Sequence, residues 1–276
     1  MKPGMRSTQA GVTLIELLVG LAIGLMAIAV ALGALLVSRG VSGTVSDATQ
    51  LQQQGAHALR TIGLQLRQAG SVRLNLAFTQ PAASGPVTID PGEPVAFETS
   101  FARASATLRS DSNSPLQVGY QNYTETVKSG STTAEQSLLA DCLGATPSAT
   151  VVQSNFTLVK ASGAATGDLQ CVGASGAAQT VVGNVADFQL RYLLQTVTAT
   201  GASIRSVTAA DAQANWPAVV AVEVCLELVG QENIDTGAAT FRNCSWVSGQ
   251  DETPMGNRIH MVFRNTFQLR TQGAPR

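Results

Sequence analysis

The pattern of apolar and polar side chains divides the chain into an apolar N-terminal stretch, an amphipathic stretch and a long region of alternating residues. From Leu17 to Val37 no side chain is charged or strongly polar, and the apolar character begins at Val12. In a helix, about 26 residues at 1.5 Å each reach roughly 39 Å, enough to cross a hydrocarbon core of about 30 Å. Residues 12–37 are therefore predicted to form a transmembrane helix.

Beyond this stretch the spacing of apolar residues predicts an amphipathic helix over residues 38–70. Apolar or small residues recur at intervals of three and four, which places them on one helix face: Leu51, Gly55, Ala58, Ile62, Leu66 and Ala69. Most polar residues of the segment, Gln65 among them, fall elsewhere on the helix. Because glycine weakens a helix, Gly40 and Gly43 predict a bend or melted stretch near residues 39–43, and Gly70 predicts the helix end.

From Ser71 onward the residues predict β-strands joined by long loops. Two segments contain short strands between Pro, Gly and Asp residues, and three later segments alternate between apolar and polar side chains: "PVTIDPGEPVAFETS" and "SDSNSPLQVGYQ", then "ADFQLRY", "PAVVAVEVCLELVG" and "RIHMVFRNTFQLR". This alternation is typical of an antiparallel sheet with one face against a core, and the long helix is its natural cover. His260 falls on the polar face of its strand, which predicts an exposed side chain. The predicted fold class is α+β, with the long helix packed against an antiparallel sheet.

Composition and charge argue against a nucleic-acid-binding protein. The chain has 276 residues, 13% of them charged, and a formal net charge of -1. A protein that binds phosphate backbones normally carries a basic surplus or a basic stripe. No nucleic-acid partner is therefore indicated.

The four cysteines, Cys142, Cys171, Cys225 and Cys244, all lie in the second half of the chain. No two of them have a C-x-x-C spacing, so a zinc site or a thioredoxin-like motif is not predicted. An even number of cysteines downstream of a membrane segment favours disulfides in an oxidising compartment. We expect sequential pairing, Cys142 with Cys171 and Cys225 with Cys244, although four cysteines permit three connectivities.

No catalytic constellation is apparent in the sequence. The chain has no G-x-S-x-G, P-loop, G-x-G-x-x-G or H-E-x-x-H motif. His57 falls on the polar side of the predicted helix, which favours a solvated residue over a ligand. The oxygen-rich stretch from Asp111 to Ser114 lacks the later glycine and glutamate of a calcium loop and reads as a solvated turn. We expect a protein that is not an enzyme, with no metal and no cofactor.

One carboxylate, Glu16, interrupts the start of the apolar stretch. An ordinary cleaved signal peptide is one interpretation, because Ala29-Val30-Ala31 imitates a small-residue cleavage site. A plain membrane anchor is another. Both leave the carboxylate unexplained, since an acidic residue in a membrane costs about 2.5 to 3.5 kcal/mol on insertion scales. The basic residues Lys2 and Arg6 predict that the N-terminus stays cytoplasmic and that the remainder lies on the outer side of the membrane.

A carboxylate inside a membrane usually has a partner. A cut between Gly11 and Val12 would create an ammonium group four residues before Glu16. That amine could meet the carboxylate of its own chain. In a helical assembly it could instead meet the carboxylate of a neighbouring subunit, which would also fix the axial register between subunits.

At these residues the sequence resembles the class III signal peptide of the type IV pilin superfamily. The family pattern is a short basic leader that ends in glycine, then a hydrophobic residue and Thr-Leu-Ile-Glu-Leu-Leu ahead of a long apolar helix. The chain reads Gly11, Val12 and then "TLIELL", and departs from the pattern only at Val12, where phenylalanine is commonest. The resemblance implies that a prepilin peptidase cuts after Gly11 and methylates the amine of Val12, and that Glu16 sets the register. It also implies a pilin-like fold.

Later segments, among them "SLLADCLG", "VVGNVADFQLRY" and "VVAVEVCLEL", resemble PilW-type minor pilins and their relatives, the J-type pseudopilins of type II secretion. The implied organisation is a leader at 1–11, a transmembrane and assembly helix at 12–37, an amphipathic helix at 38–70 and a β-rich headgroup at 71–276. The implied function is to prime or cap the tip of a type IV pilus, which serves twitching motility, adhesion or DNA uptake.

The resemblance implies partners as well. They are other minor pilins and a major pilin that meet the N-terminal helix, the prepilin peptidase, and an adhesin at the tip. The chain would lie in the bacterial inner membrane with a periplasmic headgroup before assembly, and in the pilus at the cell surface afterwards. Two alternatives stay open: a minor pseudopilin of a type II secretion system, and an adhesive module whose headgroup loops bind a ligand.

Overall fold

The computed structural model describes residues 11–72, 75–77, 96–98, 101–122, 124–147, 149, 151–270 and 272. The chain forms two compact units, Met1–Thr49 and Gln50–Arg276. The boundary between them falls inside the first helix, α1, which spans Leu14–Gln68.

In the first unit, α1 is continuous through residues 39–43. The expected melted stretch is therefore wrong. Each glycine costs a helix only about 1 kcal/mol, whereas a break would require a second, unfavourable helix nucleation. The Thr44 hydroxyl also donates a hydrogen bond of 3.0 Å to the carbonyl of Gly40, within the helix itself.

In the second unit, the apolar stripe of α1 is buried as its spacing predicts. Every member of the stripe is inaccessible or nearly so: Leu51, Gly55, Ala58, Ile62, Leu66 and Ala69. The helix ends at Gln68, beside the predicted terminator Gly70. Gly70 has a φ of 68°, which glycine adopts without strain, and its N–H donates to the carbonyl of Gly119 at 2.8 Å.

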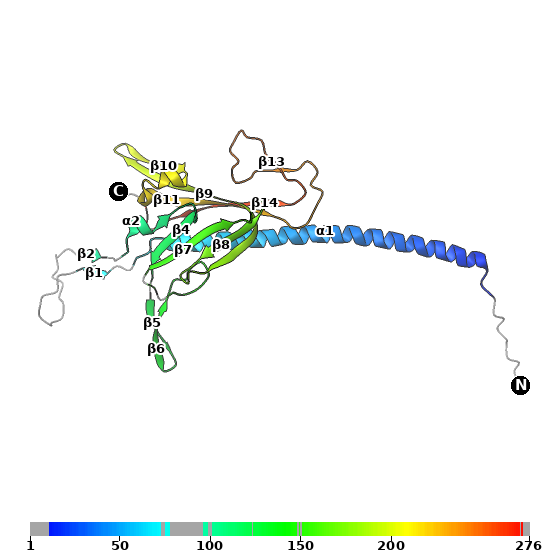
Figure 1. Cartoon of the computed structure of the whole chain (residues 1–276), viewed down its shortest axis with the longest axis horizontal. Helices are drawn as coiled ribbons and strands as arrows, with labels where there is room; N and C mark the ends of the chain where they lie inside the picture. Colours follow the sequence, from blue (N-terminus) through cyan, green and yellow to red (C-terminus); the bar gives the residue numbers. More distant parts are fainter. Residues whose placement is uncertain are drawn as a thin grey trace. The chain divides into compact units, whose positions relative to one another are not determined.

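The helix covers an antiparallel sheet, as its sequence pattern predicts (Figure 1). The strands lie in the order β14-β11-β9-β8-β7-β4-β3, and β10 pairs with the far end of β9. Their bounds are β3 Leu108–Arg109, β4 Leu116–Gln121, β7 Val151–Val159, β8 Gly167–Val172, β9 Ala178–Thr198, β10 Gly201–Val207, β11 Val219–Val229 and β14 His260–Gln268.

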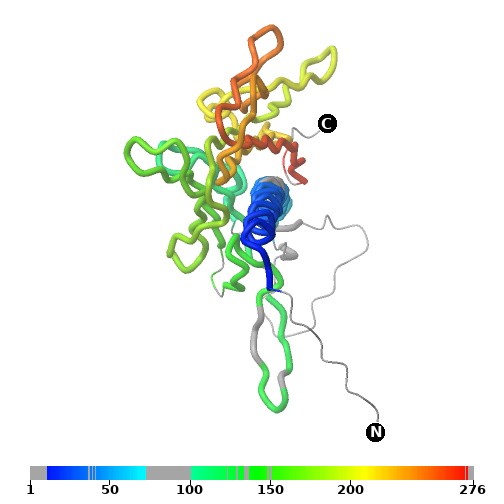
Figure 2. The backbone as a smooth tube through the Cα atoms, turned by 90° about the vertical axis from the view of Figure 1, so that its right-hand side faces the viewer, coloured from blue at the N-terminus to red at the C-terminus, as the bar shows by residue number. Residues whose placement is uncertain are grey.

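The remaining elements are short. Three two-stranded pairs are β1 Asn75–Ala77 with β2 Ala96–Glu98, β5 Thr124–Ser129 with β6 Thr132–Ser137, and β12 Thr240–Phe241 with β13 Thr253–Pro254. Single helical turns form α2 Arg103–Ala106, α3 Ala209–Ala212 and η1 Trp216–Ala218. The β5–β6 hairpin projects from the main sheet in two perpendicular views (Figures 1 and 2). Of the expected strand segment "PVTIDPGEPVAFETS", only residues 96–98 are described, and the rest lies outside the described residues.

Two glycines of α1 allow the helix to approach β14 closely. A Cβ added at Gly55 would lie 2.5 Å from the ring of Phe263, and one at Gly63 would lie 2.4 Å from the ring of Phe267. Phe267 is buried and Phe263 is half-buried. Each aromatic ring therefore occupies the space that a side chain on the helix would otherwise take.

The second face of β11 is also covered, contrary to the expectation of a solvated polar face. Cys225 and Glu227, which alternate with the core residues of this strand, are 3% and 6% exposed. The segment between β11 and β14 folds back over this face and is tied to it by a disulfide between Cys225 and Cys244. A strand's alternation reports which residues share a face, but it cannot show that a distant loop covers the polar side.

We predict that Gly63→Ala destabilises the headgroup, although alanine favours a helix by up to about 1 kcal/mol. The added methyl group meets the buried Phe267 ring, and overpacking of a core costs about 1–3 kcal/mol. Denaturant unfolding of the full chain in detergent micelles measures the net change. Gly40→Ala is the matched control, because a Cβ there meets nothing within 4 Å. If Gly63→Ala stabilised the headgroup, the contact with Phe267 would not be a tight one.

Candidate processing and assembly site

The predicted processing residues lie at the exposed start of α1. Gly11, Val12 and Thr13 precede the helix without regular secondary structure, and Val12 is 75% exposed. The peptide bond between Gly11 and Val12 is therefore accessible in this chain, as cleavage there requires.

Thr13 and Glu16 form a reciprocal capping box at the first turn. The backbone N–H and the hydroxyl of Thr13 donate to Glu16 Oε2 at 3.0 Å and 2.9 Å. The N–H of Glu16 donates in return to Thr13 Oγ1 at 3.4 Å, and the carbonyl of Thr13 accepts the first helical bond, from the N–H of Leu17, at 3.2 Å. Because the first N–H groups of a helix have no partner within it, this arrangement supplies one.

The capping box fixes where the Glu16 carboxylate lies. It folds back onto the peptide N–H of Thr13, which is the residue directly after Val12. A cut after Gly11 would therefore place the new amine next to the residue whose N–H binds the carboxylate. Thr13 is a positioning residue that the sequence interpretation missed, although a threonine three residues before a glutamate ahead of an apolar run is a readable capping signal.

The apolar segment that follows is long enough to cross a membrane. It covers Leu14–Leu36, 23 residues, and none of them is buried by the residues that the structure describes. At 1.5 Å per residue this is roughly 35 Å of helix. Its leucine, isoleucine and valine side chains are more than 45% exposed. Such a surface is unstable in water and needs lipid or other helices around it.

The four cysteines form two disulfides, Cys142–Cys171 and Cys225–Cys244, which is the sequential pairing. The first links the loop after β6 to β8. The second links β11 to the segment that covers its outer face. No free cysteine is present among the described residues, so no thiol nucleophile is available there.

His260 is not the exposed histidine that the alternation predicts. Its Nδ1 lies 2.8 Å from Oε1 of Glu227, whose side chain is only 8% exposed. The His260 ring also stacks on Phe241, with centroids 4.6 Å apart. A buried carboxylate is costly without a partner. His260, on the neighbouring strand β14, is the partner of Glu227. Through the stacking of His260 on Phe241, this pair helps to hold the covering segment in place.

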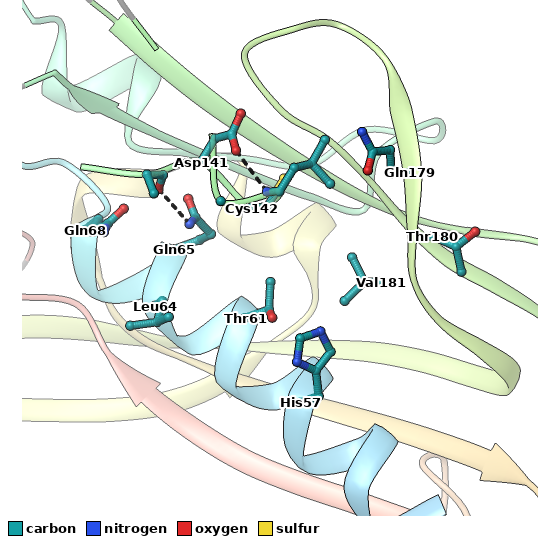
Figure 3. A pocket seen from close by; sticks show the side chains of 13 residues that line it. His57, Thr61, Leu64, Gln65, Gln68, Asp141, Cys142, Gln179, Thr180 and Val181 are labelled. Carbon is teal, nitrogen blue, oxygen red and sulfur yellow. Dashed lines mark hydrogen bonds between the residues drawn. The ribbon is translucent and has the colours of Figure 1, made fainter. Parts of the chain in front are cut away.

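A pocket of about 400 Å³ lies between the headgroup part of α1 and the loop around Asp141 (Figure 3). Gln65, expected on the polar side of the helix, is instead buried at 3% exposure. Its amide donates to the carbonyl of Ala140 at 3.1 Å, and its oxygen accepts from the Ser154 hydroxyl at 2.9 Å. His57 lines the pocket and is exposed, as predicted.

Asp141 holds the loop that borders this pocket. Asp141 accepts backbone N–H bonds from Leu143, Ala145 and Ala174, at 2.9 to 3.0 Å. Within the residues that the structure describes, no three His, Cys, Asp or Glu side chains form a group that could hold a metal ion. Hydrogen bonds beside the pocket thus join the helix to the loop and to the sheet.

We predict that Thr13→Ala frays the first turn of α1, because loss of an N-cap costs about 1 kcal/mol. Amide hydrogen exchange at Leu17 in the full chain in micelles should accelerate about fivefold. Thr13→Ser keeps the hydroxyl and should exchange at the wild-type rate. Equal rates in the alanine and serine variants would show that the capping box is not formed.

We also predict that the paired change Cys225→Ala and Cys244→Ala loosens the segment between β11 and β14. The chain-entropy model assigns such a bond about 3 kcal/mol. Trypsin should then cut after Arg242 and Arg258 faster than in the oxidised wild type. The pair Cys142→Ala and Cys171→Ala, which is remote from this segment in the sequence, should leave that cleavage rate much closer to wild type. Unchanged cleavage in the first variant would contradict the role of the bond.

The comparisons with known proteins agree with the first turn and the helix. The family described as the prokaryotic N-terminal methylation motif matches residues 6–37, and this motif implies processing by a prepilin peptidase. The chain is also similar to the solved type IV-like pilin TTHA1219 from Thermus thermophilus, with 13% identity over 60% of this chain and 83% of that chain, and a TM-score of 0.32. No curated protein matches significantly. The chain thus carries a prokaryotic N-terminal methylation motif, followed by an apolar helix and an antiparallel sheet.

Proposed function

We propose that the chain is a minor pilin of the PilW type, which primes or caps the tip of a type IV pilus. The observation that carries the proposal is the arrangement of the first turn. The methylation motif matches residues 6–37, Gly11 and Val12 are exposed, and the Glu16 carboxylate is held against the adjacent Thr13; these observations support the proposal.

The apolar helix supports an assembly role. A cleaved export signal has no need of a carboxylate at this position, since the charge lowers membrane affinity. In a fibre, the exposed side chains of Leu14–Leu36 would pack against other pilin helices instead of lipid. The methylated amine of one subunit would then pair with Glu16 of its neighbour and set their register.

The proposal includes an organisation of the chain into four parts. Residues 1–11 are a leader, 12–37 the membrane and assembly helix, 38–70 its amphipathic continuation and 71–276 the headgroup. The leader is cytoplasmic and the headgroup periplasmic before assembly, where its two disulfides form under oxidising conditions. The headgroup is larger than a repeating fibre subunit needs, which favours a place at the tip, beside other minor pilins, a major pilin and an adhesin.

A minor pseudopilin of a type II secretion system is the second candidate, because the downstream segments also resemble J-type pseudopilins. Both candidates share the processing step and differ in the machine that they join. Neither requires catalysis by the chain, and both are structural roles.

The test of processing is the intact mass of the membrane-extracted chain. We predict loss of residues 1–11 and gain of one methyl group in cells that contain the prepilin peptidase. Gly11→Ala should leave the chain uncut, and so should deletion of the peptidase. Gly20→Ala is the matched control, because it changes a glycine further along the same segment and should be processed normally. A cut near Ala31, or an uncut wild-type chain, would overturn the proposal.

Deletion of the gene then separates the two machines. Loss of pili and twitching with normal enzyme secretion supports the minor pilin. Loss of secretion with normal pili supports the pseudopilin. If both stayed normal in a strain that processes the chain, the assembly role itself would be wrong.

A further inference from the structure

The outer face of the sheet, opposite α1, contains a pocket of about 280 Å³. Three neighbouring strands form its floor. Arg191 of β9 pairs in register with Glu223 of β11, and Cys225 of β11 pairs with Arg264 of β14. The wall is the segment that begins at Cys244, which the disulfide fixes to the floor. The pocket is therefore built from rigid parts.

Two arginines supply its charge. Arg264 is held in place, because its Nη2 donates to the carbonyl of Cys244 at 3.3 Å and its Nε lies 3.7 Å from Glu223 Oε1. Arg191 is exposed, and its side chain makes no hydrogen bond or ion pair with any described residue. Among the residues that line the pocket, Glu223 supplies one carboxylate beside two guanidinium groups, so the lining itself has a net positive charge. Asp187 lies outside the lining and accepts a hydrogen bond from the lining residue Gln189 at 2.7 Å.

The nearby Arg242 does not add to this charge. Its Nε lies 2.8 Å from Glu252, which neutralises it, and its guanidinium stacks on Trp246 at 4.3 Å. The pKa of Glu252 is lowered by hydrogen bonds from Thr240 and Arg242, which keeps this carboxylate ionised. The positive charge of the pocket lining therefore lies on Arg191 and Arg264.

Apolar side chains surround this charge. Val247 lines the pocket and is 49% exposed. The β9–β10 hairpin continues the same face through Ser206, and on it lie Ile204, which is 60% exposed, and Val197, which is 49% exposed. In Figure 1 the hairpin and the β12–β13 segment lie on the same side of the headgroup. Arginine and tryptophan with an apolar surround are the composition of protein-interaction hot spots.

We propose that this surface, Arg191, Arg264, Trp246, Val247 and Ile204, docks an acidic peptide segment of a partner protein. An aspartate or glutamate of the segment binds between the two guanidinium groups, which suit a carboxylate. An apolar residue beside it covers Val247 or Ile204. A small anion would contact the arginines but leave the apolar hairpin residues in water, so a peptide fits the surface better. The inference rests on the headgroup alone and goes beyond the proposed function.

Fluorescence anisotropy of a labelled peptide tests the proposal on the full chain in detergent micelles. The probe is fluorescein-Gly-Leu-Asp-Val-Gly-amide, and the same peptide with Asn in place of Asp is its control. Empty micelles give the background. We expect saturable binding of the Asp peptide, weakened by added salt, and about tenfold weaker binding of the Asn peptide, since a hydrogen bond to a charged group contributes about 1.5 kcal/mol or more.

Single substitutions test whether the peptide binds at this surface. Arg191→Gln removes an exposed, unpaired side chain, so the fold is retained while binding weakens about tenfold. Arg205→Gln is the matched control, because Arg205 is an exposed arginine on the opposite face of the β9–β10 hairpin and should bind as wild type. Ile204→Ser should weaken binding of the Asp peptide and should not strengthen binding of the Asn peptide.

Three results would overturn the inference: equal binding of the two peptides, unchanged binding by Arg191→Gln, or no binding at millimolar peptide. None of them depends on processing of the N-terminus, so the outcome is independent of the test of the proposed function.

Discussion

The contact between the C-terminal part of α1 and β14 is the one on which the headgroup depends. The helix presents Leu51, Ile62 and Leu66 to the sheet, and each contributes about 1.5–3 kcal/mol by leaving water. Glycine at two helix positions lets aromatic rings of β14 fill the gap that would otherwise separate helix from strand. Sheet, loops and disulfides are arranged around this packed layer.

The N-terminal part of α1 is exposed, whereas its C-terminal part is buried against the sheet. Between Leu17 and Leu36 it is apolar on all sides, and none of these residues is buried by the described part of the chain. One continuous helix therefore anchors a folded unit in water and offers an uncovered surface to lipid or to other helices. The exposed apolar surface needs lipid or other helices around it. In the proposed assembly, the amine of a neighbouring subunit would meet the Glu16 carboxylate.

The outer face of the sheet shows how a polar strand face becomes a structured surface. Glu227 is buried and is paired with His260 by a hydrogen bond. The disulfide between Cys225 and Cys244 holds the segment that covers this face. Arg191 and Arg264 lie on the floor of the pocket on this face, and Glu223 is the carboxylate in its lining. In the pocket between α1 and the Asp141 loop, by contrast, Gln65 and Asp141 are bonded to Ser154 and to backbone groups.

The sequence by itself determined the elements that depend on neighbours along the chain. The apolar run, the stripe from Leu51 to Ala69 and the stop at Gly70 are local patterns, and each has the predicted place in the helix. The motif at Gly11 and Glu16 can be recognised in the sequence for the same reason. The capping box between Thr13 and Glu16 is also a local pattern, although it was not predicted from the sequence. Only the tertiary structure decided the burial of Gln65 and of Glu227, because their partners lie 89 and 33 residues away. Alternation tells which face a residue occupies, whereas long-range packing decides what covers that face.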